Sequence, residues 1–233
     1  MTDAYRSGKA NMIRGLIFDF DGLIPDTELP EFDAWQSVYA DHGGALSLDA
    51  WAICIGTAPD AFDPIADLEK QIGRSLDRAA LRRQHKARSL SMIHAQPILP
   101  GVIDVLTDAK ARGLKLGVAS TSKRAWVAGH LDRLGLIGYF DCIRCGDDVE
   151  NVKPAPDLYL AALDCLNLAP DEAIAFEDSP NGVLAATRAG LYCVAVPNPV
   201  TRRLSLDHAH RQIASLADLS LGRLLAELDN HRD

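Results

Sequence analysis

The stretch LIFDFDGLIPDTE, residues 16–28, decides how the rest of the chain is interpreted. Its first three residues are apolar and, with Gly15 before them, have the length of a short buried strand. Two aspartates one residue apart, Asp19 and Asp21, follow at once, and Gly22 comes next. Carboxylates are rarely buried without a partner, so their place directly after a buried strand calls for a chemical reason. The stretch predicts a strand whose carboxyl end carries a site.

Three further apolar runs predict more strands of the same sheet. They cover residues 114–119, 173–176 and 192–196. Apolar residues at helical spacing precede each run, within residues 102–109, 158–165 and 183–186. Continuous apolar strands that alternate with amphipathic helices are typical of a parallel sheet covered on both faces. The predicted fold class is therefore α/β, with a Rossmann-like parallel sheet.

The segment from residue 30 to residue 96 follows a different pattern. Phe32, Trp35, Val38 and Tyr39 lie on one face of a predicted helix, and residues 76–93 are helix-forming and basic. The stretch QPILPG, residues 96–101, has the prolines and glycine of a linker. We therefore predict an inserted α-helical cap domain, residues 30–96. The α/β core would consist of residues 13–29 and 97–233.

Composition limits the classes of function. The 233-residue chain is 48% hydrophobic and 24% charged, with a formal net charge of -8. This composition is typical of a globular protein, and the negative charge disfavours nucleic-acid or acidic-membrane partners. The sequence shows no signal peptide and no apolar run of membrane length. We expect a cytoplasmic protein, a monomer or weak homo-oligomer, with a loose leader of about 12 residues.

The cysteines favour a reducing compartment. There are five, an odd number, at positions 54, 142, 145, 165 and 193, and most lie in apolar runs. Cys142 and Cys145 form a CxxC pair, but no second pair exists to complete a zinc site. We interpret both as structural cysteines.

Polar side chains gather where the predicted strands end. They are Asp19 and Asp21, then Ser120, Thr121 and Ser122, then Lys153 in a later loop, and finally Glu177 and Asp178. In an open parallel sheet, ligands bind beyond the carboxyl ends of the strands. Clustered carboxylates suit Mg²⁺, and Mg²⁺ with a lysine can hold a phosphoryl group. One aspartate can then attack phosphorus while the other transfers protons.

Each of these residues alone has a simpler explanation. Asp178 could cap a helix that starts at Ser179 and Pro180. Lys153 could be a solvated loop residue, and Ser120 a turn residue. The joint pattern favours catalysis, because every one of these residues ends a strand or lies in a loop that follows one.

Four segments carry a resemblance to a known family. They are DFDGLIPDTE (19–28), VASTS (118–122), VKPAPD (152–157) and FEDSPNG (176–182). Together they closely resemble the four motifs of the haloacid dehalogenase superfamily, and most closely its β-phosphoglucomutase-like phosphatases with a helical cap. The resemblance spans about residues 13–30 and 97–200.

The resemblance implies a role for each matching residue. Asp19 would be the nucleophile and a Mg²⁺ ligand. Asp21 would be the acid and base, and its backbone carbonyl would bind the metal. Ser120 would bind the phosphoryl group, and Lys153 would pair with Asp19. Asp178 and Glu177 would complete the metal site.

The resemblance also implies how substrate is held. Ser122 and Lys123 match positions that touch a second phosphate in the mutase. In the cap, Glu31, Trp35 and Thr57 are expected near the substrate, over which the cap would close as a lid.

Asp21 decides between reactions within the superfamily. Similar dehalogenases have an aromatic residue there, and similar phosphonatases lack the aspartate, whereas an alkoxide leaving group needs a proton. The predicted function is therefore a Mg²⁺-dependent phosphatase of a small phosphorylated metabolite, such as a sugar phosphate, acting through an aspartyl-phosphate.

Two alternatives remain open. A sugar-phosphate mutase is one, although Glu31 aligns with its cap histidine and Pro59 lies near the position of its substrate-binding arginine. A catalytically inactive domain that binds a protein partner is the other, although Asp19, Asp21 and Asp178 are all retained. The basic residues Arg78, Arg82, Arg83, Lys86 and Arg88 could form such a partner surface, but a solvated helix face explains them more simply.

Overall fold

A computed structural model describes residues 12–56 and 62–230. These residues form one six-stranded sheet in the order β3-β2-β1-β4-β5-β6, and every pair of neighbours is parallel. The strands are β1 (Gly15–Phe18), β2 (Lys115–Ala119), β3 (Cys142–Arg144), β4 (Ala173–Glu177), β5 (Tyr192–Ala195) and β6 (Arg211–Gln212). The predicted α/β parallel sheet is confirmed.

The register of the three central strands positions the site. Phe18 of β1 pairs with Val118 of β2 and with Phe176 of β4. The three strands therefore end at the same level, and the residues after them meet at one edge of the sheet. Phe18 and Phe176 are fully buried and stack with ring centroids 5.0 Å apart. Truncating a buried phenylalanine costs about 3–5 kcal/mol, so this pair holds the register firmly.

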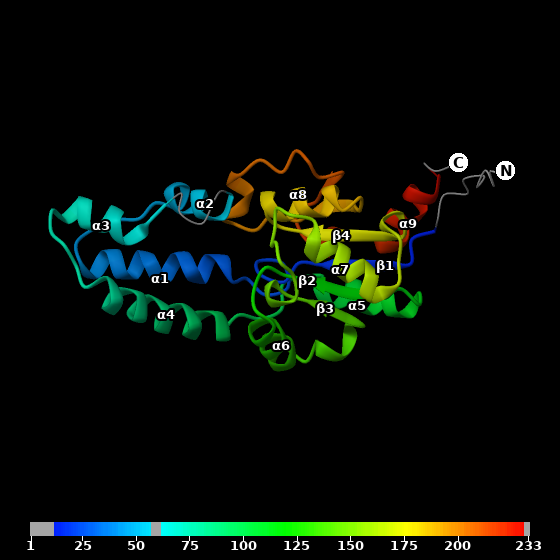
Figure 1. Cartoon of the computed structure of the whole chain (residues 1–233), viewed down its shortest axis with the longest axis horizontal. Coiled ribbons are helices and arrows are strands. Elements are labelled where there is room, and N and C mark those ends of the chain that lie inside the picture. Colours follow the sequence, from blue (N-terminus) through cyan, green and yellow to red (C-terminus); the bar gives the residue numbers. More distant parts are fainter. Residues whose placement is uncertain (1–11, 57–61, 231–233) are drawn as a thin grey trace.

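Helices cover both faces of the sheet, as Figure 1 shows. Leu16 and Phe18 of β1 pack with α5 (Val102–Ala111), α6 (Arg124–Arg133) and α9 (Leu221–Asn230). Ile17 points to the other face and packs with α7 (Asp157–Leu166) and α8 (Pro180–Arg188). Alternate residues of one strand thus enter two separate apolar layers, as continuous apolar strands predict.

The described residues of the predicted cap form four helices that extend from one end of the sheet (Figure 1). They are α1 (Glu28–Asp41), α2 (Leu48–Gly56), α3 (Pro64–Ile72) and α4 (Arg78–His94). All four residues of the predicted helical stripe, at positions 32, 35, 38 and 39, are buried in the core of the cap. Helix α1 begins at Glu28, two residues before the expected boundary, so the division at residue 30 stays a prediction.

Two linkers connect the cap to the core. Pro25 pairs with Ile98 as an isolated antiparallel bridge. The backbone N–H of Leu99 donates to the carbonyl of Ile24 at 2.9 Å. The two linkers are therefore tied to each other on the core side of the cap.

Two strands and one disulfide were not predicted. Strands β3 and β6 have three and two residues, too few to show a hydrophobic period. Cys142 forms a disulfide with Cys165 of α7, which the reducing compartment favoured by the odd cysteine count does not predict. The partners lie 23 residues apart on different elements, and sequence spacing alone does not pair such cysteines. Within the described ranges, no helix combines the length and the apolar composition needed to cross a membrane.

Candidate active site

A cavity of about 810 Å³ lies where the cap meets the carboxyl edge of the sheet. The core contributes Asp19, Asp21, Ser120, Thr121, Ser122, Trp126, Lys153 and Asp178 to its lining, and the cap contributes Glu28, Glu31, Cys54, Ile55 and Ile93. The polar residues predicted from the strand ends are therefore brought together, as the level ends of β1, β2 and β4 require.

Lys153 forms the positive centre of the site. Its ammonium pairs with the carboxylate of Asp19 and lies 2.5 Å from Oε1 of Glu177. Burial lowers the pKa of Lys153, but the charges of the two carboxylates outweigh burial and raise that pKa above its ordinary value. Lys153 is only 6% exposed, so it is not the solvated loop residue of the simpler interpretation. It therefore stays charged.

Three buried carboxylates provide a candidate metal site. Ligand atoms of Asp19, Glu177 and Asp178 all lie within 4.8 Å of one another. Burial, followed by the charges of its neighbours, raises the pKa of Asp178 well above its ordinary value. Burial likewise raises the pKa of Asp19 to about 7, against the opposing effect of Lys153. Bound cations favour the charged form of such groups, and oxygen donors suit Mg²⁺.

The loop after β1 approaches this cluster closely. Gly22 has φ +78°, and a Cβ placed there would lie 2.6 Å from Oδ2 of Asp178 and 2.6 Å from Nδ2 of Asn198. Any other residue at position 22 would clash and would also adopt an unfavourable left-handed backbone conformation. Gly22 therefore lets the main chain reach the carboxylates.

Asp178 is held by a residue that the sequence did not reveal. The amide Nδ2 of Asn198 donates to Oδ2 of Asp178 at 2.7 Å. The other end of the amide, Oδ1, accepts from the backbone N–H groups of Val200 and Thr201. Ser179 rather than Asp178 caps helix α8, because its side chain accepts from the N–H of Gly182. The helix-cap interpretation of Asp178 is therefore wrong.

Asp21 receives three hydrogen bonds. Ser122 Oγ donates to its Oδ2 at 2.6 Å, and Ser120 Oγ lies 3.3 Å from the same atom. The indole Nε1 of Trp126 donates to its Oδ1 at 2.9 Å. Trp126 was not predicted from the sequence. It lies in the first turn of α6, and no local sequence pattern shows which face of that helix points to the cavity.

The cap side of the cavity is acidic. Glu31 lies 3.2 Å from the ring nitrogen Nε2 of His85, and that ring stacks on Trp35 with centroids 4.2 Å apart. Thus Glu31 does not stand alone, because an imidazole from α4 lies against it. Burial, then the charges of Asp21 and Glu31, raises the pKa of Glu28 to about 8. Glu28 ends the opening stretch, three residues before Glu31, a spacing that places both on one helix face.

The residues implied to contact substrate differ in where the structure places them. Lys123 is exposed, precedes α6 and is not part of the lining. Thr57, like Pro59, lies outside the described residues. Of the others, Ser122 and Glu31 line the cavity, whereas Trp35 lies behind them in the cap core.

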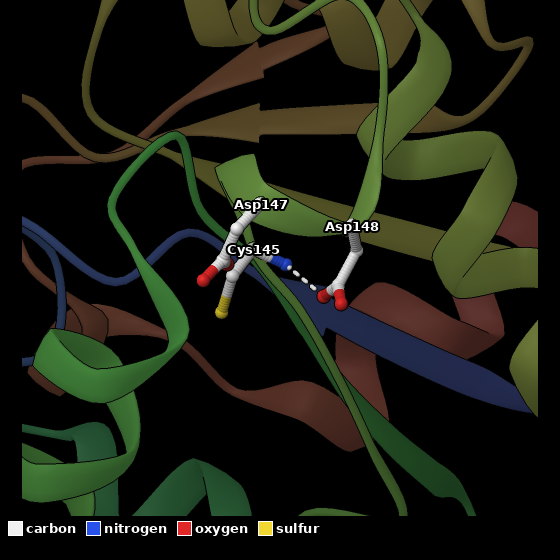
Figure 2. A group of neighbouring side chains, drawn as sticks. All are labelled: Cys145, Asp147 and Asp148. Carbon is white, nitrogen blue, oxygen red and sulfur yellow. Dashed lines mark hydrogen bonds between the residues drawn. The ribbon is translucent and has the colours of Figure 1, made fainter.

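Figure 2 shows a second group of possible metal ligands, Cys145, Asp147 and Asp148. Asp148 accepts from the backbone N–H of Cys145 at 2.8 Å and pairs with Arg124 at 2.5 Å. Asp147 accepts from the backbone N–H of Arg124 at 2.9 Å. Both carboxylates are exposed and are occupied by these local contacts, so the buried group around Asp19 is the better candidate.

Comparisons with known proteins agree with this geometry. YhcW of Bacillus subtilis is 45% identical over 219 residues, which cover 94% of this chain and 99% of the relative. A phosphorylated carbohydrates phosphatase of Thermotoga maritima is 34% identical over 180 residues, covering 77% of this chain and 82% of the relative. A crystal structure named as a β-phosphoglucomutase of Clostridium difficile superposes with TM-score 0.72 at 26% identity, covering 94% and 98% of the two chains.

The family model for haloacid dehalogenase-like hydrolases matches residues 16–196. This range contains all four segments on which the resemblance was based, together with the cap. The expected family is confirmed: the chain belongs to the haloacid dehalogenase-like hydrolases.

Proposed function

We propose that this protein is a Mg²⁺-dependent phosphatase that hydrolyses a monoester of a small polyhydroxylated metabolite, such as a sugar phosphate, through an aspartyl-phosphate at Asp19. The observation that carries the proposal is the environment of Asp19. It pairs with the ammonium of Lys153, clusters with the carboxylates of Glu177 and Asp178, and shares its cavity with Asp21. The relative from Thermotoga maritima that is named for phosphorylated carbohydrates supports the class of substrate.

The residues suit the two steps of such a hydrolysis. Asp19 attacks phosphorus, and Asp21 gives a proton to the leaving oxygen as its bond to phosphorus breaks. In the second step, Asp21 takes a proton from the water that attacks the phosphoryl group, and Asp19 is released. Lys153 and Ser120 bind the oxygens of the transferring group.

Asp19, Asp178, Glu177 and the backbone carbonyl of Asp21 would hold Mg²⁺. A bound ion at this site supplies positive charge that offsets the carboxylates and the phosphoryl oxygens. Without a cation, burial disfavours the ionised form of Asp19, and this form is the nucleophile.

The charge of the cavity favours a substrate with one phosphate. Lys153 is the sole lysine or arginine among the described residues that line it, and the cap side presents Glu28 and Glu31. A carboxylate at Glu31 accepts hydrogen bonds from hydroxyl groups but repels a second phosphate. Glu28, whose pKa is raised to about 8, contributes hydrogen bonds rather than repulsion at neutral pH. A neutral polyol therefore fits the cap side, and a sugar bisphosphate, which a mutase needs, fits it poorly.

The mutase nevertheless remains the second candidate, because the Clostridium difficile structure is named as a β-phosphoglucomutase. A cytoplasmic location, and a monomeric or weakly associated state, are further proposals that rest on sequence composition alone.

The proposal is tested with a panel of phosphorylated metabolites. We expect Mg²⁺-dependent release of inorganic phosphate from at least one sugar phosphate, and none with excess EDTA. β-Glucose 1-phosphate with a trace of the bisphosphate separates the candidates. Accumulation of glucose 6-phosphate without phosphate release would establish the mutase and overturn the phosphatase.

A further inference from the structure

Trp126 is placed to act on the proton-transfer group without touching the phosphoryl group itself. It lies in the first turn of α6, is half-buried, and lines the cavity beside Asp21. Its indole N–H donates to Oδ1 of Asp21 at 2.9 Å. We propose that Trp126 is a positioning residue that fixes the Asp21 carboxyl group so that Oδ2 transfers the proton. This inference rests on the proposed role of Asp21 as acid and base.

The indole ring is supported from behind. The buried ring of His130, one helical turn later, contacts Trp126 edge-on with centroids 4.2 Å apart. Arg133 lies 3.3 Å from Nδ1 of His130 and donates to the carbonyl of His94 at 3.0 Å, where the cap joins its linker. The ring therefore cannot turn away from Asp21 without disturbing these contacts.

The two oxygens of Asp21 meet different kinds of partner. An indole N–H can donate but cannot accept, so Trp126 keeps Oδ1 as an acceptor. Ser122 Oγ lies 2.6 Å from Oδ2, and Ser120 Oγ lies 3.3 Å from it. A hydroxyl can donate or accept, so these contacts tolerate Oδ2 both with and without a proton. The proton is therefore carried by Oδ2, on the side of Ser120.

This assignment gives a complete path for the proton. In the first step, the proton on Oδ2 moves to the leaving oxygen, which keeps the electron pair of its broken bond to phosphorus. In the second step, Oδ2 takes a proton from water as the oxygen of that water bonds to phosphorus and the bond from phosphorus to Asp19 breaks. Oδ2 is thereby ready for the next cycle, and Oδ1 remains bound to Trp126 throughout.

The test compares substrates that differ in their need for a proton. Trp126→Phe keeps the aromatic packing and removes the N–H. We expect kcat/KM for an alkyl phosphate to fall about 10- to 100-fold, a part of the roughly 10²- to 10⁴-fold that a general acid contributes. With p-nitrophenyl phosphate, whose leaving group departs without a proton, kcat/KM should change by less than about twofold. An equal loss with both substrates, or no loss with either, would overturn the proposal.

Trp51→Phe is the matched control. The indole Nε1 of Trp51 is buried in the cap and has no hydrogen-bond partner within the described residues. Removing this N–H should leave kcat/KM unchanged with both substrates. If Trp51→Phe caused the same leaving-group-dependent loss, the loss would result from replacing any tryptophan and not from the hydrogen bond to Asp21. That result would contradict the proposal.

A second measurement tests the hydrogen bond directly and does not depend on enzymatic activity. In the ¹⁵N-labelled protein, Asp21→Ala should shift the indole N–H resonance of Trp126, identified by its loss in Trp126→Phe, and leave that of Trp51 in place. An unmoved Trp126 resonance would show that the hydrogen bond does not exist. Failure of the wild-type protein to release phosphate from any ester would instead refute the proposed function, whatever the resonances show.

Discussion

The core side and the cap side of the cavity are built differently. On the core side, Asp19, Asp21 and Asp178 are each held by side chains from other elements, at the ends of paired strands. On the cap side, Glu31 contacts His85 of one neighbouring helix, and Glu28 begins α1 beside the linker. The core side presents a fixed charge pattern, and the cap side presents side chains whose positions depend on helix packing. We infer that chemistry resides in the first and substrate choice in the second.

The largest effect is expected on the core side, at Asp19, the proposed nucleophile. Asp19→Asn removes the anionic oxygen and should lower kcat by on the order of 10⁴-fold or more. Thermal stability should not fall, because the replacement also removes a carboxylate that burial disfavours. Phosphate release by single turnover and thermal unfolding measure the two quantities. Turnover near the wild-type rate would show that another group attacks phosphorus.

Replacing the proposed metal ligand Asp178 should have a smaller effect, which excess metal relieves. Asp178→Ala removes one of three clustered carboxylates, and the Mg²⁺ concentration for half-maximal activity should rise by about 10- to 100-fold. Asp147→Ala is the matched control, because Asp147 belongs to the exposed group of Figure 2. Lower activity of Asp178→Ala with an unchanged Mg²⁺ requirement would mean that Asp178 does not bind the ion.

On the cap side, the effect is expected in stability and should depend on pH. The pKa of Glu28 is raised from 4.5 to about 8 in the folded protein. Ionising Glu28 therefore opposes folding, and stability is lost as pH rises from about 4.5 towards 8. Glu28→Gln removes this loss. The midpoint temperature of the variant should exceed that of the wild type by several degrees more at pH 8 than at pH 5. Equal gains at both pH values would show that the carboxyl group titrates normally.

The smallest effect should concern substrate affinity. His85→Phe keeps the stacking on Trp35 and removes the partner of Glu31. One hydrogen bond is worth about 1 kcal/mol, so KM for the preferred substrate should rise about fivefold while kcat stays within twofold. His85→Gln, which retains a donor, is the control. A fall in kcat with unchanged KM would place His85 in the chemistry rather than in substrate binding.

The difference between strand ends on the core side and packed helices on the cap side also explains which features could be predicted from the sequence. Strands β1, β2, β4 and β5 are continuous apolar runs, and parallel strands bring the residues after them to one edge. The convergence of Asp19, Ser120 and Asp178, which follow β1, β2 and β4, was therefore predictable, whereas Lys153 lies in the loop after β3, a strand that was not predicted. Strands β3 and β6 are too short to show a period.

The residues that were missed come from helices and loops. Trp126, His85 and Asn198 contact Asp21, Glu31 and Asp178 across large sequence separations. Their positions depend on how a helix or loop packs in three dimensions, and no spacing within the sequence encodes that packing. The catalytic and metal-binding roles of the site residues themselves stay predictions until the variants are measured.

The bridge between Pro25 and Ile98 has a consequence for how new specificities arise in such a protein. Both connections to the cap leave the core beside this bridge, so the segment between them is one continuous insertion that leaves and re-enters the core at one place, with a further contact to the core where Asp49 of α2 pairs with Arg203. A cap of different length or sequence can replace it while the sheet edge and its carboxylates keep their register. Exchange of caps between relatives is thus the simplest route by which one catalytic core acquires many substrates.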